Sequence, residues 1–222
     1  MDGNGRWAKK RGLPRNVGHS RGASVFRSTV EHCAKTGVKT LTVYAFSSEN
    51  WNRPKEEIAA LMNLFRDYLK DSSNYLHKNV RTRFIGDREI LDDDIVKLME
   101  KAEESTKDYD LMTLNIAINY GGQNEILNAV KLLLEESEVN GKSSKEVIKE
   151  AFEKHLYTYP SNSVDLLIRP SGEHRISNFL LWQLAYAEFV FFDDILWPDF
   201  KDSDIDRAIE EFSKRNRRFG AV

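Results

Sequence analysis

The sequence lacks the features on which several large classes of protein depend. It contains a single cysteine, Cys33, so no disulfide can form within the chain and a reducing compartment is expected. The most apolar stretch, 176–198, is interrupted by polar and charged residues and is too broken to span a membrane. The start of the sequence contains no apolar run of the kind that marks a signal peptide. These absences argue against a disulfide-stabilised secreted protein and against a membrane-spanning one.

Other absences narrow the choice of ligand. The net charge of -2 argues against general nucleic-acid binding, although basic residues gather before position 30 and acidic ones at 92–110. The pattern GxxxxGK[ST] is missing, which removes the usual signature of a nucleotide-binding P-loop. Neither HxxxH nor CxxC occurs, so the spacing gives no support to a zinc site.

The residues that are present alternate between strand-like and helix-like segments. Apolar patterns predict strands at 41–46, 80–86, 114–119, 164–168 and 189–192. Helical spacing is found at 58–69, 126–134, 95–107, 144–155, 177–187 and 203–217. With 222 residues, 41% of them hydrophobic, the chain is expected to form one α/β domain, 1–222, with a mainly parallel central sheet flanked by helices.

Polar residues and glycines follow most of the predicted strands. These segments are Ser47–Arg53, Asn119–Asn124, Arg169–Asn178 and Asp193–Asp194. Open parallel sheets bind ligands beyond the carboxyl ends of their strands, so these segments are expected to meet. Arginines in or near them, whose forked donors match phosphate oxygens, are Arg6, Arg15, Arg53, Arg169 and Arg175. Any one of them could simply pair with a surface carboxylate, but together they suit two phosphate-bearing ligands.

The chain opens with Met-Asp-Gly-Asn-Gly-Arg-Trp, residues 1–7. Asp2 is a candidate magnesium ligand, because Mg²⁺ takes one or two carboxylates together with phosphate oxygens. Gly3 and Gly5 would allow backbone N–H groups to approach a phosphate. Taken alone, however, this string is also typical of a surface turn. The lone histidines His19 and His174 are likewise more often structural than ligand-binding.

Four stretches resemble, in order along the whole chain, the motifs of the cis-prenyltransferase family. They are MDGNGRWA with Arg15 and Gly18-His19, YAFSSENWNRP from Tyr44, NIAINYGG from Asn115, and VDLLIRPSGEHRISNFLLWQ from Val164 with Tyr186–Glu188 and Leu196–Asp199. The resemblance implies a transferase that condenses farnesyl diphosphate, an allylic diphosphate, with successive isopentenyl diphosphates, each new double bond being cis. The implied product is a long-chain polyprenyl diphosphate, undecaprenyl diphosphate, for the lipid carrier of cell-wall synthesis.

The resemblance also implies roles for individual residues. Asp2 would bind Mg²⁺ and help the allylic diphosphate to ionise, with Glu188 and His174 as further candidate metal ligands. The residues implied to hold the allylic diphosphate are Gly3, Asn4, Gly5, Arg6, Trp7, Arg15 and His19. Those implied to hold isopentenyl diphosphate are Arg169, Arg175, Ile176 and Ser177, and those implied to shape a mobile loop are Ser47, Ser48, Glu49, Trp51 and Arg53. Asn50 is the implied assistant in proton removal, although a neutral amide is a poor base and phosphate itself could accept the proton.

The chain departs from the family's pattern in two places. Pro170-Ser171 stands where Thr-Gly is usual, and proline fixes φ and removes a backbone donor. An apolar strand usually precedes the aspartate, and here the sequence starts one residue before Asp2. The expectation is therefore that the first strand of the sheet is missing and that the sequence begins at an internal methionine of a longer protein.

Partners and rival functions follow from the same residues. The resemblance implies a cytoplasmic homodimer with at most peripheral membrane contact and no nucleic acid, its interface furnished by the aromatic C-terminal third. The helix at 58–69 would line a tunnel for the growing chain, or would simply pack in the core. The alternatives are a non-catalytic subunit of a prenyltransferase complex and a phosphate- or nucleotide-binding module without prenyl chemistry. Activity of the chain alone, and binding of farnesyl diphosphate rather than ATP, separate the three.

Overall fold

The structure is a computed structural model that describes residues 1–70, 79–139 and 149–215. Its helices are α1 (Asn4–Lys10), α2 (Arg15–Lys35), α3 (Lys55–Lys70), α5 (Asp93–Thr106), α6 (Gly122–Val139), α7 (Lys149–Glu153) and α8 (Asp202–Ser213). Its strands are β1 (Thr40–Ser47), β2 (Val80–Ile85), β3 (Met112–Tyr120), β4 (Leu166–Pro170) and β5 (Glu188–Phe192). Short 3-10 helices lie at η1 (Ser48–Asn52) and η3 (Trp197–Asp199). Each of these strands overlaps a stretch that the sequence predicts as a strand.

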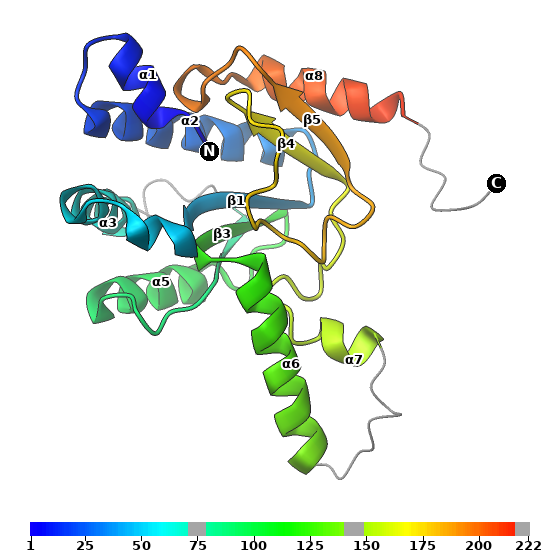
Figure 1. Ribbon diagram of the computed structural model, residues 1–222. Helices are drawn as coiled ribbons and strands as arrows, with labels where there is room; N and C mark the ends of the chain where they lie inside the picture. Colours follow the sequence, from blue (N-terminus) through cyan, green and yellow to red (C-terminus); the bar gives the residue numbers. More distant parts are fainter. Residues whose placement is uncertain (71–78, 140–148, 216–222) are drawn as a thin grey trace.

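All described strand pairs run parallel (Figure 1). β3 lies between β1 and β2 in a three-stranded sheet, and β4 pairs with β5 in a second sheet. β3 is buried along almost its whole length, as expected of a central strand with both faces covered. The prediction of one domain with a mainly parallel central sheet and flanking helices is therefore confirmed, although the sheet is divided into two parts.

The helices enclose the main hydrophobic core between the two parts of the sheet. α5 packs against β2, and α8 packs against β4 and β5. α2 joins the two parts, because it contacts α3, α8 and η3 (Figure 1). Among the helices described, none combines the length and apolar character that a membrane crossing requires.

The first residues form a helix, where the sequence suggests a loop or turn. Gly3, with φ of 96°, precedes α1 and allows the chain to turn into the helix at Asn4. α1 then packs closely on α2, since a Cβ at Gly18 would lie 2.1 Å from the Asn4 carbonyl oxygen. A Cβ at Gly22 would lie 2.3 Å from Asn4 Oδ1. These small residues of α2 therefore fix the position of the opening segment.

The helix predicted at 177–187 is wrong. The structure forms consecutive turns there, because Ser177, Asn178 and Leu180 adopt left-handed backbone conformations with φ of 49°, 61° and 44°. Such residues interrupt a right-handed helix despite the apolar spacing around them. The helix predicted at 144–155 is represented by α7 alone, its residues 144–148 lying outside the described part. The helix predicted at 203–217 is α8, which ends at Ser213, and positions 216–217 also lie outside the described part.

β1 and β4 each have an edge that no described strand pairs. β1 pairs with β3 and β4 pairs with β5 on their other edges. Every residue of both strands lines one cavity, as expected when strands present an edge rather than an alternating face to a space. In the described residues no strand precedes Asp2. The first strand expected from the sequence stays a prediction.

Candidate functional site

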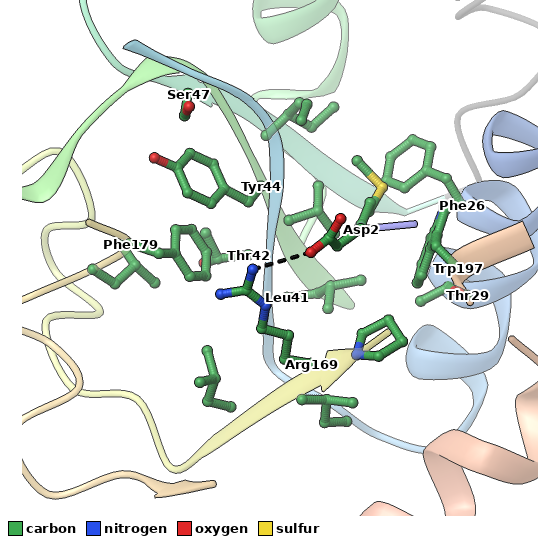
Figure 2. Close-up of a pocket in the computed structure, with 18 of the residues that line it drawn as sticks. Asp2, Phe26, Thr29, Leu41, Thr42, Tyr44, Ser47, Arg169, Phe179 and Trp197 are labelled. Atoms are coloured by element: carbon green, nitrogen blue, oxygen red, sulfur yellow. Dashed lines mark hydrogen bonds and ion pairs between the residues drawn. The ribbon is translucent and has the colours of Figure 1, made fainter. Parts of the chain in front are cut away.

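The candidate site is a cavity of about 1370 Å³ bounded by β1, β4, α2 and α3. Apolar side chains form much of its wall, and Figure 2 shows Phe26 and Trp197 to one side of the Asp2–Arg169 pair and Phe179 to the other. The predicted site residues that line it are Asp2, Gly3, Asn4, Gly5, Arg6, Arg15, His19, Ser47, Glu49, Asn50, Arg53, Arg169, Arg175, Ile176 and Ser177. Those that do not line it are Trp7, Ser48, Trp51, His174 and Glu188. The structure thus brings together most of the residues that the sequence singles out.

One group of charged side chains joins the start of the chain to the loop after β4. We call it the Asp2 cluster; its members are Asp2, Arg6, Arg169, Glu173, Arg175 and Ser177. Arg169 donates to Asp2 Oδ2 at 3.0 Å, to Ser177 Oγ at 2.9 Å and to the Arg175 carbonyl oxygen. Figure 2 shows Asp2 and Arg169 directed toward one another beside β1. Arg169 therefore anchors the aspartate and the loop together.

The Asp2 cluster holds more cations than carboxylates. Arg6 donates to the Ser171 carbonyl oxygen at 2.9 Å and lies 3.5 Å from a carboxylate oxygen of Asp2 and of Glu173. Arg175 pairs with Glu173 at 2.5 Å. The cluster contains three guanidinium groups and two carboxylates, so its net charge is +1. That surplus favours an anion at this end of the cavity.

The Asp2 carboxyl is held in its ionised form. Its partial burial, the largest single influence, raises the pKa, but the hydrogen bond and charge of Arg169 lower it more. The chain's α-amino group and Arg6 add to the lowering, so the pKa lies below its usual value. Asp2 is thus a carboxylate at neutral pH, which is the form that binds Mg²⁺.

A second charged group lies at the start of α2 and around the start of α3. We call it the Glu57 cluster; its members are Arg15, Arg53, Glu57 and His19. Glu57 accepts from Arg53 Nη1 at one carboxylate oxygen and from Arg15 Nη1 at the other, both at 2.8 Å. Two guanidinium groups thus share one carboxylate, again with one positive charge left over. A Cβ on Gly5 would meet Arg15 Nε at 2.5 Å, so this glycine lets Arg15 lie against α1.

His19 is neutral at physiological pH. Burial lowers its pKa most, and the charges of Arg53 and Arg15 lower it further against the opposing charge of Glu57. Its Nε2 atom is buried and has no hydrogen-bond partner among the described residues. Because a buried polar atom normally has a partner, His19 fits a ligand contact at the cavity.

The segment after β1 is held at several points. The Ser47 backbone N–H donates to Asn50 Oδ1 at 3.1 Å, which fixes the first turn of η1. Trp51 Nε1 donates to Asn119 Oδ1 at 2.8 Å, and its ring packs edge-on against Phe46 at 5.1 Å. Trp51 therefore anchors η1 to the end of β3, while Ser47, Glu49 and Asn50 line the cavity.

The three candidate metal ligands form no single cluster in the described part of the chain. His174 lies 2.5 Å from Asp193, just beyond the end of β5, and stacks on Phe191. Glu188 begins β5 and pairs with Arg215 at 2.7 Å, whereas Asp2 contacts Arg169 and Arg6. Within residues 1–70, 79–139 and 149–215, no three His, Cys, Asp or Glu side chains gather as a metal site. Asp2 is the one of the three candidate ligands that lines the cavity, and Mg²⁺ commonly takes one or two carboxylates together with phosphate oxygens and water.

The structure shows the contacts of Trp7, which does not line the cavity, and of Pro170-Ser171, which departs from the family's usual Thr-Gly. Trp7 is buried against Leu196, and its Nε1 donates to Asp199 Oδ1 at 2.7 Å. Pro170 ends β4 in register with β5, so its missing N–H does not prevent pairing. Ser171, with φ of 85°, donates its backbone N–H to the Ile195 carbonyl oxygen at 2.7 Å and presents its own carbonyl to Arg6. The Pro-Ser loop thus contributes to the site.

Two residues at the site are not singled out by the sequence. One is Glu57, which the structure places between Arg15 and Arg53. The i, i+4 spacing of Arg53 and Glu57 is the signal that identifies this contact. Asn178 is predicted within a helix, but the structure connects it to η1 and α6. No spacing in the sequence reports those long-range contacts.

Comparison with known proteins gives one consistent result. A family model described as "Putative undecaprenyl diphosphate synthase" matches residues 1–220. The isoprenyl transferase of Fusobacterium nucleatum is 49% identical over 100% of this chain and 94% of the relative. The isoprenyl transferase of Thermotoga maritima is 50% identical, again over 100% of this chain and 94% of the relative.

Solved structures show the same similarity. Lavandulyl diphosphate synthase from Lavandula x intermedia, solved in complex with dimethylallyl diphosphate, superposes with a TM-score of 0.94 at 32% identity, covering 99% of this chain and 95% of that one. A probable undecaprenyl diphosphate synthase from Campylobacter jejuni superposes with a TM-score of 0.80 at 36% identity, covering 90% of this chain and 92% of that one. These similarities extend over most or all of this chain.

Proposed function

The chain belongs to the undecaprenyl diphosphate synthase family and is a prenyltransferase of isoprenoid biosynthesis, and we propose that it extends farnesyl diphosphate with isopentenyl diphosphate. Each addition gives a cis double bond, and the product is undecaprenyl diphosphate for the lipid carrier of the cell wall. The observation that carries the proposal is that two charged clusters, each with a surplus positive charge, line one cavity with an apolar wall.

The two diphosphates are assigned to different parts of the cavity. The allylic diphosphate lies between Asp2, Arg6 and the Arg15 side of the Glu57 cluster, with His19 Nε2 as a further contact. Isopentenyl diphosphate lies against Arg169, Arg175 and Ser177. Because Asp2 contacts Arg169 directly, the aspartate marks the boundary between the two sites. The dimethylallyl diphosphate in the lavandulyl diphosphate synthase structure is in accord with a diphosphate site of this kind.

The reaction requires charge stabilisation on the departing diphosphate. Mg²⁺, bound by Asp2 and diphosphate oxygens, would supply much of it. Arg6 and Arg15 hold the leaving group by charge-assisted hydrogen bonds that need no rearrangement during the reaction. Asn50 Oδ1 already accepts from Ser47, and a neutral amide is a poor base, so Asn50 orients substrate while a diphosphate oxygen accepts the proton.

The apolar wall protects the cation and receives the product. Leu61, Met62 and Phe65 of α3 line the cavity opposite β1 and β4. A dry, apolar space keeps water from the allylic cation, and its length limits the growing chain. The helix that the sequence predicts at 58–69 is therefore assigned to the tunnel, in which the added isoprene units accumulate.

A steady-state assay with the purified chain tests this function. The proposal predicts incorporation of labelled isopentenyl diphosphate that depends on farnesyl diphosphate and is abolished by chelation of divalent metal. Chromatography of the products reports their length. Activity that appears only with an added protein would favour the non-catalytic subunit instead. Binding of ATP without binding of farnesyl diphosphate would favour the phosphate-binding module.

We also propose a cytoplasmic homodimer. Leu127, Val130 and Leu134 are exposed at i, i+3 and i+7 on one face of α6, which projects from the rest of the molecule in Figure 1. Apolar side chains gathered on an exposed face favour association, so α6 replaces the aromatic C-terminal third as the candidate interface. Sedimentation should give a dimer for the native chain and a monomer for Leu127→Glu combined with Leu134→Glu; a native monomer would contradict the proposal.

A further inference from the structure

Asn178 lies where three loops of the site meet. Its Nδ2 donates to Glu49 Oε1 in η1 at 2.8 Å. Its Oδ1 accepts from the Gln123 backbone N–H at 2.9 Å, and its carbonyl accepts from the Gly122 backbone N–H at 2.7 Å. Asn178 thus uses both ends of its side chain and its backbone to join η1, the start of α6 and the loop after β4.

The backbone places this junction next to a substrate-contacting residue. Ser177 directly precedes Asn178, and both are left-handed, with φ of 49° and 61°. Asparagine tolerates this conformation better than most residues, and glycine tolerates it freely. Ser177 Oγ in turn accepts from Arg169 at 2.9 Å. A shift of Asn178 would therefore move Ser177 relative to Arg169.

The close approach of these loops is built into the turn after β3. A Cβ on Gly121 would lie 2.7 Å from Asn178 Nδ2 and 2.7 Å from Ser48 Oγ, so a larger residue would push η1 and Asn178 apart. The Glu49 carboxylate is held in its ionised form here: burial raises its pKa, but the hydrogen bond from Asn178 and further bonds within η1 lower it more. The Glu49–Asn178 contact is thus a charge-assisted bond between the loops.

Resting on the proposed function, we propose that Asn178 is a positioning residue, and that its bond to Glu49 sets the distance between the allylic and isopentenyl diphosphates. η1 is followed directly by Arg53, which shares Glu57 with Arg15 on the allylic side, and Ser177 lies on the isopentenyl side. The bond between Glu49 and Asn178 spans the two sides. It acts on the condensation step, where the two substrates must be held at reacting distance.

A charge swap tests the bond. Asn178→Asp keeps an acceptor for Gln123 and suits the left-handed backbone, but it removes the donor and places two carboxylates together. We expect kcat to fall roughly tenfold or more, with smaller changes in KM for either substrate. Adding Glu49→Gln returns an N–H to the pair, so the double variant should recover most of the lost kcat. Glu49→Gln alone sets the baseline for that comparison.

Two controls separate positioning from general destabilisation. Asn79 is also left-handed, with φ of 77°, and its Nδ2 donates to Asp110 Oδ1 at 2.8 Å, before β2 and away from the cavity. Asn79→Asp creates the same carboxylate pair there and should leave kcat unchanged. Asn178→Gly keeps the backbone conformation without a carboxylate; its kcat should fall, and Glu49→Gln should not restore it.

The outcomes are distinct. The inference is supported if Glu49→Gln restores kcat in the Asn178→Asp variant and does not restore it in the Asn178→Gly variant. Additive losses in the double variant, or equal losses from Asn79→Asp, overturn it while leaving the proposed function intact. Absence of any prenyl transfer by the native chain overturns the proposed function and the inference together. Melting temperatures of all variants show whether a loss of kcat reflects unfolding, and Asn178→Gly serves where Asn178→Asp fails to fold.

Discussion

The Asp2 and Glu57 clusters line the same cavity but are held in different ways. The Glu57 cluster is built on α2 and the start of α3, and its Arg53–Glu57 pair is local, at i, i+4. The Asp2 cluster joins residues 167 positions apart, Asp2 and Arg169, and depends on the loop after β4. The Glu57 cluster is therefore held mainly by helices and local contacts. The Asp2 cluster forms only when distant parts of the chain have folded together.

The clusters are alike in charge, which indicates parallel tasks. Each retains one positive charge after its ion pairs are counted. They differ in that Asp2 offers a carboxylate to a metal, whereas Glu57 uses both of its oxygens on arginines. Removal of Asp2 should therefore affect chemistry most, and changes in the Glu57 cluster should affect binding and stability.

The largest effect is expected for Asp2→Ala. The variant removes the candidate metal ligand, and turnover should fall by roughly 100-fold or more. The fold should persist, because the backbone bond from Trp197 to the carbonyl of residue 2 remains. Steady-state kinetics and thermal melting measure the two effects. Asp108→Ala, a change at an exposed acid outside the cavity, is the control; native-like turnover in Asp2→Ala would remove the aspartate from the mechanism.

A lysine exchange should distinguish the clusters next. Arg169 makes three contacts that a single ammonium group cannot reproduce, whereas Arg15 makes one with Glu57. Arg169→Lys should raise KM for isopentenyl diphosphate roughly 10- to 100-fold, the loss of one or two charge-assisted bonds. Arg15→Lys should raise KM for the allylic substrate by roughly threefold at most. Equal effects would contradict the difference in how the clusters are held.

A smaller effect is expected for Glu57→Gln, and on stability. The change removes the shared carboxylate, but Arg15 is 60% exposed and water screens its charge. The free energy of unfolding should fall by about 1 kcal/mol, measured with denaturant. The pKa of His19 should also fall, because the Glu57 charge raises it in the native chain. NMR titration measures the His19 pKa in both proteins, and a higher value in the variant would contradict the assigned geometry.

The smallest effect is the contribution of His19 to the pH dependence of stability. Its folded pKa lies below the ordinary 6.5, so below pH 6.5 the unfolded chain takes up a proton that the folded chain does not. Stability should therefore be fully present above pH 6.5 and fall as the pH drops toward the folded pKa. His19→Gln should flatten the melting-temperature slope in this window. Asp2 does not contribute in this pH window, because its pKa is lowered from 3.8 and it affects stability only near and below that pH.

The strands could be predicted from the sequence because their signals are local. β1 and β3 alternate apolar and polar or small residues over short runs bounded by turn residues, and both formed where expected. The helix predicted at 177–187 did not form, because left-handed residues at Ser177 and Asn178 are stabilised by contacts with α6 and Arg169 that apolar spacing does not encode. α2 was not predicted either; its role depends on glycines that make room for α1.

The members of the site could be predicted, but their grouping could not. Motif resemblance identified Asp2, Arg15 and Arg169, and the structure lines one cavity with all three. The resemblance assigns Asp2 and Arg169 to different substrates, yet they contact each other directly. That contact depends on how the start of the chain packs beside β4. His174 and Glu188, which the resemblance names with Asp2 as candidate metal ligands, pair with Asp193 and Arg215 in the described residues.

Ligand binding to a matched pair of arginine variants tests the two-site claim most directly. Arg15 and Arg175 lie in different clusters with similar side-chain exposure, 60% and 65%, so both can be replaced with little structural cost. Calorimetry would use a thio-linked farnesyl diphosphate analogue that does not ionise, and isopentenyl diphosphate, each titrated with the other saturating. One molecule of each ligand should bind per chain. Arg15→Ala should weaken only the allylic analogue, and Arg175→Ala only isopentenyl diphosphate, each by roughly tenfold. Loss of the same ligand in both variants would contradict it.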